Sequence, residues 1–385
     1  MKKICFITTI SETMGWFLTD TAKYLSENDF DVTLVCNMPS EFQAKHSAYA
    51  HCIDIRMARG FKLSGAPRSF FSLYRLFRKE KFDIIQYTTP NASLYASIAG
   101  KFAGIKVRLY CQWGLRYVSV QGIARKILKA LEKITCNCST WIEPDSFGNL
   151  MLSRSEGLYT PKNSSVVWNG SASGVDLHRF DAAKREERSK AVRTRFSIPD
   201  DAYVFGFIGR VDVDKGFNEM MTAFRRISKE HEDARFLFVG LEDKIDLVDQ
   251  QLYKWSKESD KVVYTGVVPD SEVYESAMDC LLLPSYREGF GSVVVEAGAL
   301  GVPVIATDII GPQESIIDGE TGFLVQVKSS DALYEKMKLL YKDRALGRRL
   351  GRAAMQHVRA KYDHDKLLKH ILEDRLRLLK GTQRS

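Results

Sequence analysis

The sequence lacks the features of several protein classes. No apolar run in its 385 residues approaches the roughly 20 residues needed to cross a bilayer. The seven cysteines are scattered, and the close pair Cys136 and Cys138 has a spacing that fits neither a zinc site nor a redox motif. An odd number of scattered cysteines argues against a disulfide framework. With 45% hydrophobic and 27% charged residues, the composition predicts a soluble globular protein, and the cysteine pattern predicts the reduced cytoplasm.

Two further absences narrow the function. Neither half of the chain has a G-x-G-x-x-G motif after a strand with an acid about 20 residues later, which disfavours a dinucleotide-dependent oxidoreductase. The start, Met1–Lys3 followed by Ile4–Ile10, is similar to a signal peptide. Its apolar run is short and no small-residue cleavage site follows, so we interpret Ile4–Ile10 as a first β-strand.

The positive charge is confined to the first half. Residues 1–180 contain 23 Lys and Arg against 14 Asp and Glu, whereas the remainder contains 33 against 34. Such asymmetry suggests that the first half meets an anionic surface, although a solvated basic face is an equal alternative. No nucleic-acid-binding motif accompanies the charge, so we expect no nucleic-acid partner.

Short β-like runs alternate with amphipathic, helix-like segments in both halves of the chain, which predicts right-handed βαβ units and parallel sheets covered on both faces. The expected strands are Ile4–Ile10, Val32–Cys36, Ile84–Tyr87, Val107–Cys111, Val166–Trp168, Val204–Ile208, Phe236–Val239, Val262–Thr265, Cys280–Leu283, Val304–Ala306 and Phe323–Val325. Helices are expected over Trp16–Glu27, Arg68–Lys79, Ala92–Ala103 and Ile123–Ile134.

A charge-dense run at Asp181–Thr194 has no strand character and marks a domain boundary. We predict one Rossmann-like, doubly wound domain over 1–180 and another over 181–360, facing a central cleft between the carboxyl ends of their strands. Tyr362–Leu379 has apolar residues at helical spacing, so residues 361–385 are expected to form a closing helix that packs back across the junction.

The stretch 284–297 is the most informative in the sequence. A strand ends before Pro284, a loop with Gly289 and Gly291 follows, and a helix begins near Ser292. The free amides at 290–293 and the helix dipole make an anion site. Glu296 lies about one turn inside the helix, where it either complements the dipole or accepts hydrogen bonds from a nucleotide ribose.

Two cations follow the strand Val204–Ile208. Arg210 comes directly after Gly209, and Lys215 precedes Gly216 and a helix, so both lie at the carboxyl edge of the sheet that carries Glu288. A lone cation in a loop is usually solvated. Two cations beside a glycine-rich anion loop favour binding of a diphosphate, whose charge they would neutralise as it departs.

These residues carry a family resemblance. The runs 287–297, 301–307 and 318–325, with 209–216 and 169–176, resemble retaining glycosyltransferase family 4, of GT-B fold, and Glu288 and Glu296 match its E-x7-E motif. The resemblance implies a nucleotide-diphosphate-sugar donor, a UDP-sugar being the commonest, with an N-acetylhexosamine as one candidate for the sugar. It also implies front-face attack through an oxocarbenium-like state, without a metal or other cofactor.

The resemblance assigns Arg210 and Lys215 to the donor phosphates, Glu288 to the transferred sugar and Glu296 to the ribose. The other donor-site residues expected are Gly209, Gly266, Phe290, Gly291, Ser292 and Val293. The first half departs from the family pattern: the loop after the first strand keeps Gly15 alone, and Gln112 and Trp113 stand where many members have a histidine. All three are candidates for the acceptor side, although Trp113 is equally explained by core packing.

Two basic amphipathic segments, Pro67–Lys81 and Gln121–Lys133, are typical of membrane-surface elements or of half-buried helices with solvated cations. Members of the resembled family with this charge pattern often glycosylate lipid-linked acceptors, so the resemblance implies a bacterial enzyme that extends a polyprenyl-diphosphate-linked or oligosaccharide acceptor of a surface glycan, such as capsule or lipopolysaccharide, at the inner face of the cell membrane. The alternatives are a sugar-nucleotide epimerase of the same fold and a catalytically silent scaffold.

Overall fold

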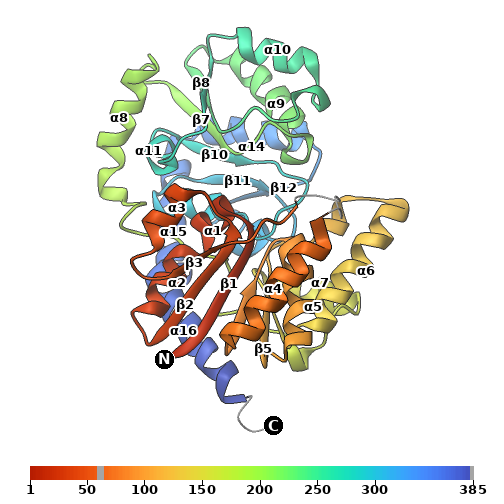
Figure 1. Ribbon diagram of the computed structural model, residues 1–385. Helices are drawn as coiled ribbons and strands as arrows, with labels where there is room; N and C mark the ends of the chain where they lie inside the picture. The colour runs from red at the N-terminus through yellow and green to blue at the C-terminus, as the bar shows by residue number, and fades with distance from the viewer. Residues whose placement is uncertain (59–64, 382–385) are drawn as a thin grey trace. The chain divides into compact units, whose positions relative to one another are not determined.

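The chain forms two compact units in the computed structural model, which describes residues 1–58 and 65–381 (Figure 1). Unit 1 comprises Met1–Ser173 and Asp365–Ser385, and unit 2 comprises Gly174–His364. The boundaries therefore fall at 173/174 and 364/365 rather than at the expected 180/181 and 360/361. The final segment returns to unit 1.

Unit 1 contains a six-stranded parallel sheet in the order β3-β2-β1-β4-β5-β6. Its strands are β1 (Lys2–Ile10), β2 (Phe30–Asn37), β3 (His51–Asp54), β4 (Ile84–Tyr87), β5 (Val107–Gln112) and β6 (Trp141–Pro144). Its helices are α1 (Ser11–Phe17), α2 (Thr19–Ser26), α3 (Ser40–His46), α4 (Ala66–Glu80), α5 (Pro90–Ala103), α6 (Gly122–Cys138), α7 (Phe147–Ser155) and α16 (His364–Gly381), with 3-10 turns at Arg116–Ser119 and Pro161–Asn163.

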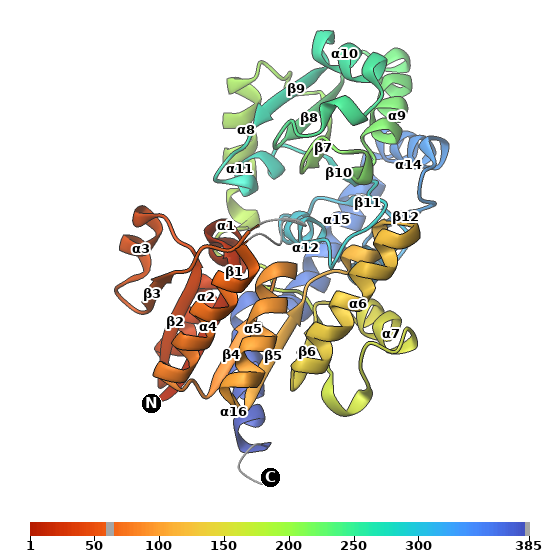
Figure 2. The same ribbon diagram turned by 45° about the vertical axis from the view of Figure 1, so that its right-hand side comes forward.

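Helices cover both faces of this sheet, which is why its central strands are apolar throughout rather than alternating. One apolar cluster joins the sheet to α4, α5 and α6, and another joins the opposite face to α1, α2 and α16. Figure 2 shows α4 and α5 in front of the sheet and α16 behind it. The expected helix 16–27 is broken, because α1 ends at Phe17 and α2 begins at Thr19.

The last helix of the chain is held to unit 1 by a buried charge network. Arg375 of α16 is 1% exposed and donates to both carboxylate oxygens of Glu143 on β6 and, at 3.1 Å, to Gln86 on β4. Asp374 contacts the same guanidinium at 2.9 Å. An ionised group at this depth needs such partners, so they fix the position of α16 on the sheet.

Unit 2 repeats the architecture with the strand order β12-β11-β10-β7-β8-β9. Its strands are β7 (Tyr203–Ile208), β8 (Ala234–Val239), β9 (Val262–Gly266), β10 (Cys280–Leu283), β11 (Val304–Thr307) and β12 (Gly322–Val325). Its helices are α8 (Arg185–Arg195), α9 (Phe217–Glu230), α10 (Gln250–Glu258), α11 (Ser271–Glu275), α12 (Ser292–Ala299), α13 (Pro312–Ser315), α14 (Ser330–Lys342) and α15 (Arg344–Lys361), with 3-10 turns at Ala182–Lys184, Val213–Lys215 and Ile245–Leu247.

The predicted class, two Rossmann-like parallel-sheet units, is confirmed. One predicted strand is wrong: Val166–Trp168 is not a strand, because Trp168 has a left-handed backbone (φ 50°) and packs with Leu367 and Ile371 of α16. β3 and β6, at the edges of the unit 1 sheet, were not predicted. Among the described residues no helix is both long enough and apolar enough to span a membrane.

Candidate active site

The two central strands of unit 2 mark where a ligand of this sheet is expected. β7 and β10 are parallel neighbours, with Phe205 opposite Cys280. The chain leaves β7 toward β8 and leaves β10 toward β11, so the connections diverge at the carboxyl ends of these strands. Ligands of doubly wound sheets bind at such a switch point. The loops that follow β7 and β10 there are the two that the sequence singles out.

Lys215 and Glu288 meet at this edge. Lys215 Nζ lies 2.6 Å from Glu288 Oε1, and the two side chains are 25% and 12% exposed. Gly216 makes the approach possible: its φ is 72°, and a Cβ there would lie 2.2 Å from the carbonyl oxygen of Pro284. Only glycine lets the turn after β7 pack so closely on the loop after β10. An ammonium group has three donors, so Lys215 can hold Glu288 and still donate to an anion.

Arg210 lies at the same sheet edge but in a different charge network. Its guanidinium contacts Asp243 at 3.0 Å and Asp212 at 3.6 Å, and Lys244 contacts Asp212 at 2.7 Å. Asp212 also accepts a hydrogen bond from the amide of Asp214 at 3.1 Å, in the turn that carries Lys215. The two predicted cations are therefore linked through Asp212, and each has its own carboxylate partner.

Helix α12 begins at this edge without a side-chain cap. Its N-cap is Gly291, with φ 82°, and the first turn closes by a bond from the amide of Val294 to the carbonyl of Gly291. No backbone acceptor for the amides of Ser292 and Val293 is found within the described part of the chain. These amides and the positive end of the helix dipole lie where the sequence predicts an anion-binding end, which stays a prediction. The ring of Phe290 packs on Tyr362 in the core, which leaves its backbone as the part predicted to meet a ligand.

Glu296, one turn into α12, is surrounded by other acids. Burial raises its pKa to about 7, against the opposing effects of the Arg179 charge and a hydrogen bond with Ser292. Arg179 Nε lies 2.8 Å from a carboxylate oxygen of Glu272. The pKa of Glu275 is well above its ordinary value. Burial is the main cause, and the charge of Glu296 is the second. Sequence reasoning missed this acidic cluster, whose signal was two acids three residues apart just before a buried strand.

Glycines end the three neighbouring strands β7, β8 and β9. Gly209 and Gly240 touch so closely that a Cβ on Gly240 would lie 1.9 Å from the Gly209 carbonyl oxygen. The amide of Gly240 donates to Gly266, which has φ 73° and open space where a side chain would stand. Gly209 and Gly266 thus belong to the same carboxyl edge as Arg210 and Lys215, and at Gly266 no neighbouring atom covers the position of a side chain.

Of the acceptor-side candidates in unit 1, Gln112 lies in the interior. Gln112 is fully buried: its amide donates to Glu132 at 2.5 Å, and its oxygen accepts from Ser153 at 3.1 Å and Tyr159 at 2.8 Å. Gln112 therefore presents no surface to an acceptor. The prediction that it lines a sugar site is wrong, because it belongs to an interior hydrogen-bond network. The reason is that its polar atoms are already satisfied by side chains of α6, α7 and the following loop.

Trp113 contacts α1, the helix that carries Gly15. Trp113 follows β5 directly, is half-buried, and its ring lies 5.5 Å from that of Phe17 in α1. Gly15 is two residues earlier in α1, where a Cβ would meet the ring of Phe42 at 3.4 Å. Both lie at the carboxyl edge of the unit 1 sheet.

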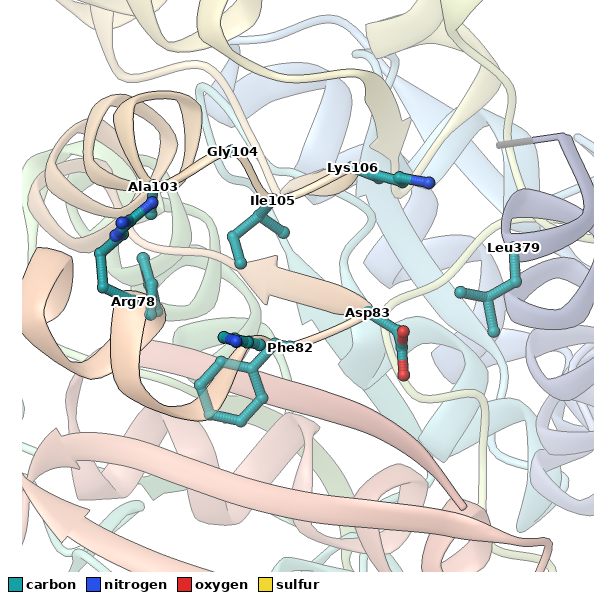
Figure 3. A pocket seen from close by; sticks show the side chains of 10 residues that line it. Arg78, Phe82, Asp83, Ala103, Gly104, Ile105, Lys106 and Leu379 are labelled. Carbon is teal, nitrogen blue, oxygen red and sulfur yellow. The ribbon is translucent and has the colours of Figure 1, made fainter. Parts of the chain in front are cut away.

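A separate cavity of about 460 Å³ lies at the opposite edge of unit 1. Asp83 and Lys106, which precede β4 and β5, line it together with Arg78 of α4. Figure 3 shows Arg78 and Lys106 on opposite sides of the cavity and Leu379 of α16 at its margin. Because it lies at the amino ends of the strands, it is not where a doubly wound sheet holds its main ligand. Over the described residues, no group of three or more His, Cys, Asp or Glu side chains is placed to hold a metal ion.

Comparison with known proteins bears on both units. Residues 189–357 match the family model of the glycosyl transferases group 1, and residues 3–144 match that of the glycosyl transferase 4-like proteins. The chain is 28% identical over 361 residues to the capsular polysaccharide biosynthesis glycosyltransferase CapM of Staphylococcus aureus, which covers 94% of this chain and 93% of that relative.

Two more similarities are informative. The chain is 24% identical over 332 residues to the UDP-Gal:alpha-D-GlcNAc-diphosphoundecaprenol alpha-1,3-galactosyltransferase of Escherichia coli, with 84% of this chain and 83% of the relative covered. The crystal structure of Anabaena Alr3699/HepE in complex with UDP and glucose has a TM-score of 0.79 at 16% identity, covering 97% of this chain and 99% of that one. The latter likeness concerns the fold.

Proposed function

Because this chain belongs to the glycosyltransferases of the group 1 and 4-like families and has the GT-B fold, we propose that it transfers a hexose from a nucleotide-diphosphate-sugar to a hydroxyl of a glycan. The transfer retains the configuration of the sugar. The observation that carries the proposal is the Lys215–Glu288 pair at the switch point of unit 2, on the edge where the first two amides of α12 have no backbone acceptor among the described residues. Phosphate oxygens are the ligands that such an edge binds best.

The chemistry of the donor follows from these groups. Lys215, Arg210 and the amides of Ser292 and Val293 neutralise the charge that develops on the departing diphosphate. Glu288 lies beside the transferred sugar. Glu296 accepts hydrogen bonds from the ribose hydroxyls, and its ionised form, which is acceptor-only on both oxygens, accepts them best. The step needs no metal in this scheme, because the protein's own cations and amides supply the positive charge.

UDP is the proposed base and diphosphate. The supports are the UDP bound to the structurally similar HepE and the UDP-galactose named for the Escherichia coli relative. The transfer assay identifies which hexose is transferred. An N-acetylhexosamine is one candidate. The proposed acceptor is a polyprenyl-diphosphate-linked glycan, by similarity to the diphosphoundecaprenol substrate named for that relative, and the product serves capsule or surface polysaccharide synthesis, as named for CapM.

A lipid-linked acceptor favours attachment to the inner face of the cell membrane. In unit 1, α4 packs on α5 and α5 on α6, and all three cover one face of the sheet. Their outer surface exposes large apolar side chains, notably Phe102 at 71% and Ile123 at 77%, among many cations. Apolar groups between cations suit an anionic lipid surface. We therefore assign membrane contact to the outer surface of α4, α5 and α6.

The test begins with ligand stabilisation. UDP, GDP and ADP, each with its sugars, are added to the protein and thermal unfolding is followed. A ligand at about 100 times its Kd should stabilise the protein by about 2.7 kcal/mol. Glu296→Ala should abolish the response to the nucleotide that binds.

Transfer is then assayed with the stabilising nucleotide sugar and a GlcNAc-diphosphate joined to a short alkyl chain. Products that appear only with the acceptor, with the donor's anomeric configuration, support the proposal. Conversion of the donor without an acceptor would instead identify an epimerase. Stabilisation by no nucleotide would overturn the donor site.

A further inference from the structure

A hollow of about 290 Å³ lies between α1 and α3 of unit 1. Ser11, which follows the last residue of β1, forms part of its lining, so the hollow opens at the carboxyl end of that strand. In the strand order, β1 and β4 are the neighbours from which the chain diverges, toward β2 and toward β5. The hollow is therefore beside the switch point of unit 1, where this sheet is expected to hold a ligand.

Trp16 is the unusual side chain of this hollow. It is 72% exposed, whereas tryptophan in folded proteins is normally mostly buried. The helix itself explains why the indole stays in solvent: Met14 of α1 is fully buried and Phe17 packs on Trp113, so α1 is anchored through its other side chains. An exposed indole that lines a hollow offers a face on which a ligand ring can stack.

The rest of the lining is shaped around that indole. Gly15 leaves the floor open, because a Cβ there would reach the Phe42 ring at 3.4 Å. Glu12 and Lys45, both exposed, supply a carboxylate and an ammonium group at the rim. The hollow thus offers an aromatic face, an acceptor and a donor, in a volume near the lower end of small-molecule pockets, which start at about 300 Å³.

We propose that this hollow binds one pyranose ring of the glycan acceptor, stacked on the indole of Trp16, with Glu12 and Lys45 hydrogen-bonded to its hydroxyls. A pyranose has an apolar face of C–H groups and a rim of hydroxyls, which match an aromatic ring and a polar rim in turn. A lipid chain would leave the two charged groups without partners. The inference rests on the proposed function in that the ring belongs to the acceptor.

Binding is tested without catalysis. Saturation-transfer NMR is recorded with the methyl pyranosides of glucose, galactose, N-acetylglucosamine and N-acetylgalactosamine. Trp16→Ala should raise the Kd of the binding sugar about tenfold, equivalent to about 1.4 kcal/mol. Trp16→Phe, which keeps an aromatic face, should restore most of the affinity. Met151→Ala removes another exposed apolar side chain of unit 1, on α7, and should have no effect.

Kinetics separate this site from the donor site. With the GlcNAc-diphosphate acceptor, Trp16→Ala should raise the acceptor KM while the donor KM, the unfolding temperature and the stabilisation by UDP stay unchanged. Equal acceptor KM for Trp16→Ala and Met151→Ala, or no sugar binding by the wild type, would overturn the inference and leave the proposed transfer standing. Conversely, Trp16-dependent sugar binding in a protein that transfers nothing would uphold the site and refute the proposed function.

Discussion

Replacing Lys215 tests whether the charge at the switch point acts in catalysis or only in folding. Lys215 Nζ is 2.6 Å from a carboxylate oxygen of Glu288, whose side chain is 12% exposed. Lys215→Met keeps the length of the side chain and removes the charge. The carboxylate is then left nearly buried and without its cation, so we expect the free energy of unfolding to fall by about 1.5–3 kcal/mol.

The catalytic effect should be larger and should have a different origin. If the ammonium group stabilises the departing diphosphate, its loss costs about 2.7–4 kcal/mol in the transition state, or about 10²- to 10³-fold in kcat. The double variant Lys215→Met/Glu288→Gln tests the stability effect, because Glu288 is itself assigned to the transferred sugar. It removes both charges of the pair, so stability should recover while kcat stays low. Urea unfolding and the transfer assay give the two quantities.

Lys244 provides the matched control. It lies at the same sheet edge and pairs with Asp212 at 2.7 Å, but has no assigned role with the donor. Lys244→Met should leave kcat close to the wild-type value. Recovery of kcat in the double variant along with stability would show that Lys215 acts only through folding. An equal loss of kcat in Lys244→Met would show a general effect of charge at this edge. Either result refutes the assignment of Lys215.

Three further predictions concern other parts of the chain. Because the pKa of Glu296 is raised to about 7, UDP affinity should increase as pH rises through 7, and the free energy of unfolding should decrease between pH 4.5 and about 7, since the folded protein holds the proton longer; titration calorimetry and urea unfolding should show both trends, and both should be weaker in Glu296→Gln, where buried Glu275 still contributes to the second. Arg375→Met should cost about 3–5 kcal/mol of stability by leaving Glu143 buried and charged; addition of Glu143→Gln should restore part of it in urea unfolding, and no restoration would mean that packing dominates. Phe102→Ser should reduce co-sedimentation with anionic vesicles more than Leu247→Ser, an exposed leucine of unit 2, and equal effects would contradict the assigned membrane face.

The strands that sequence patterns missed share a physical cause. β3 (His51–Asp54) and β6 (Trp141–Pro144) are short, carry charged residues and lie at the edges of the sheet. Glu143 in β6 is an acid that local pattern places in a loop. Its burial is stabilised by Arg375, which lies on a helix more than 200 residues later in the sequence. A sequence window contains no sign of that partner.

Residues near the active site show the same division. The glycine-bearing loop before α12 and the turn at Gly216 were predictable, because each depends on local backbone requirements. The interior position of Gln112 was not, because it depends on Glu132, Ser153 and Tyr159, which come from separate elements.

By itself, the sequence determined the parallel-sheet architecture, most strands and the edge of unit 2 that gathers the predicted donor residues. These depend on periodicity, glycine placement and strand ends, which are local. The tertiary structure alone decided that Arg210 pairs with Asp212 and Asp243 rather than with Glu288, that acids surround Glu296, and that Trp16 stands open beside a hollow. Such features depend on which distant groups share a dielectric environment and which surfaces remain uncovered, and only the packed chain specifies them.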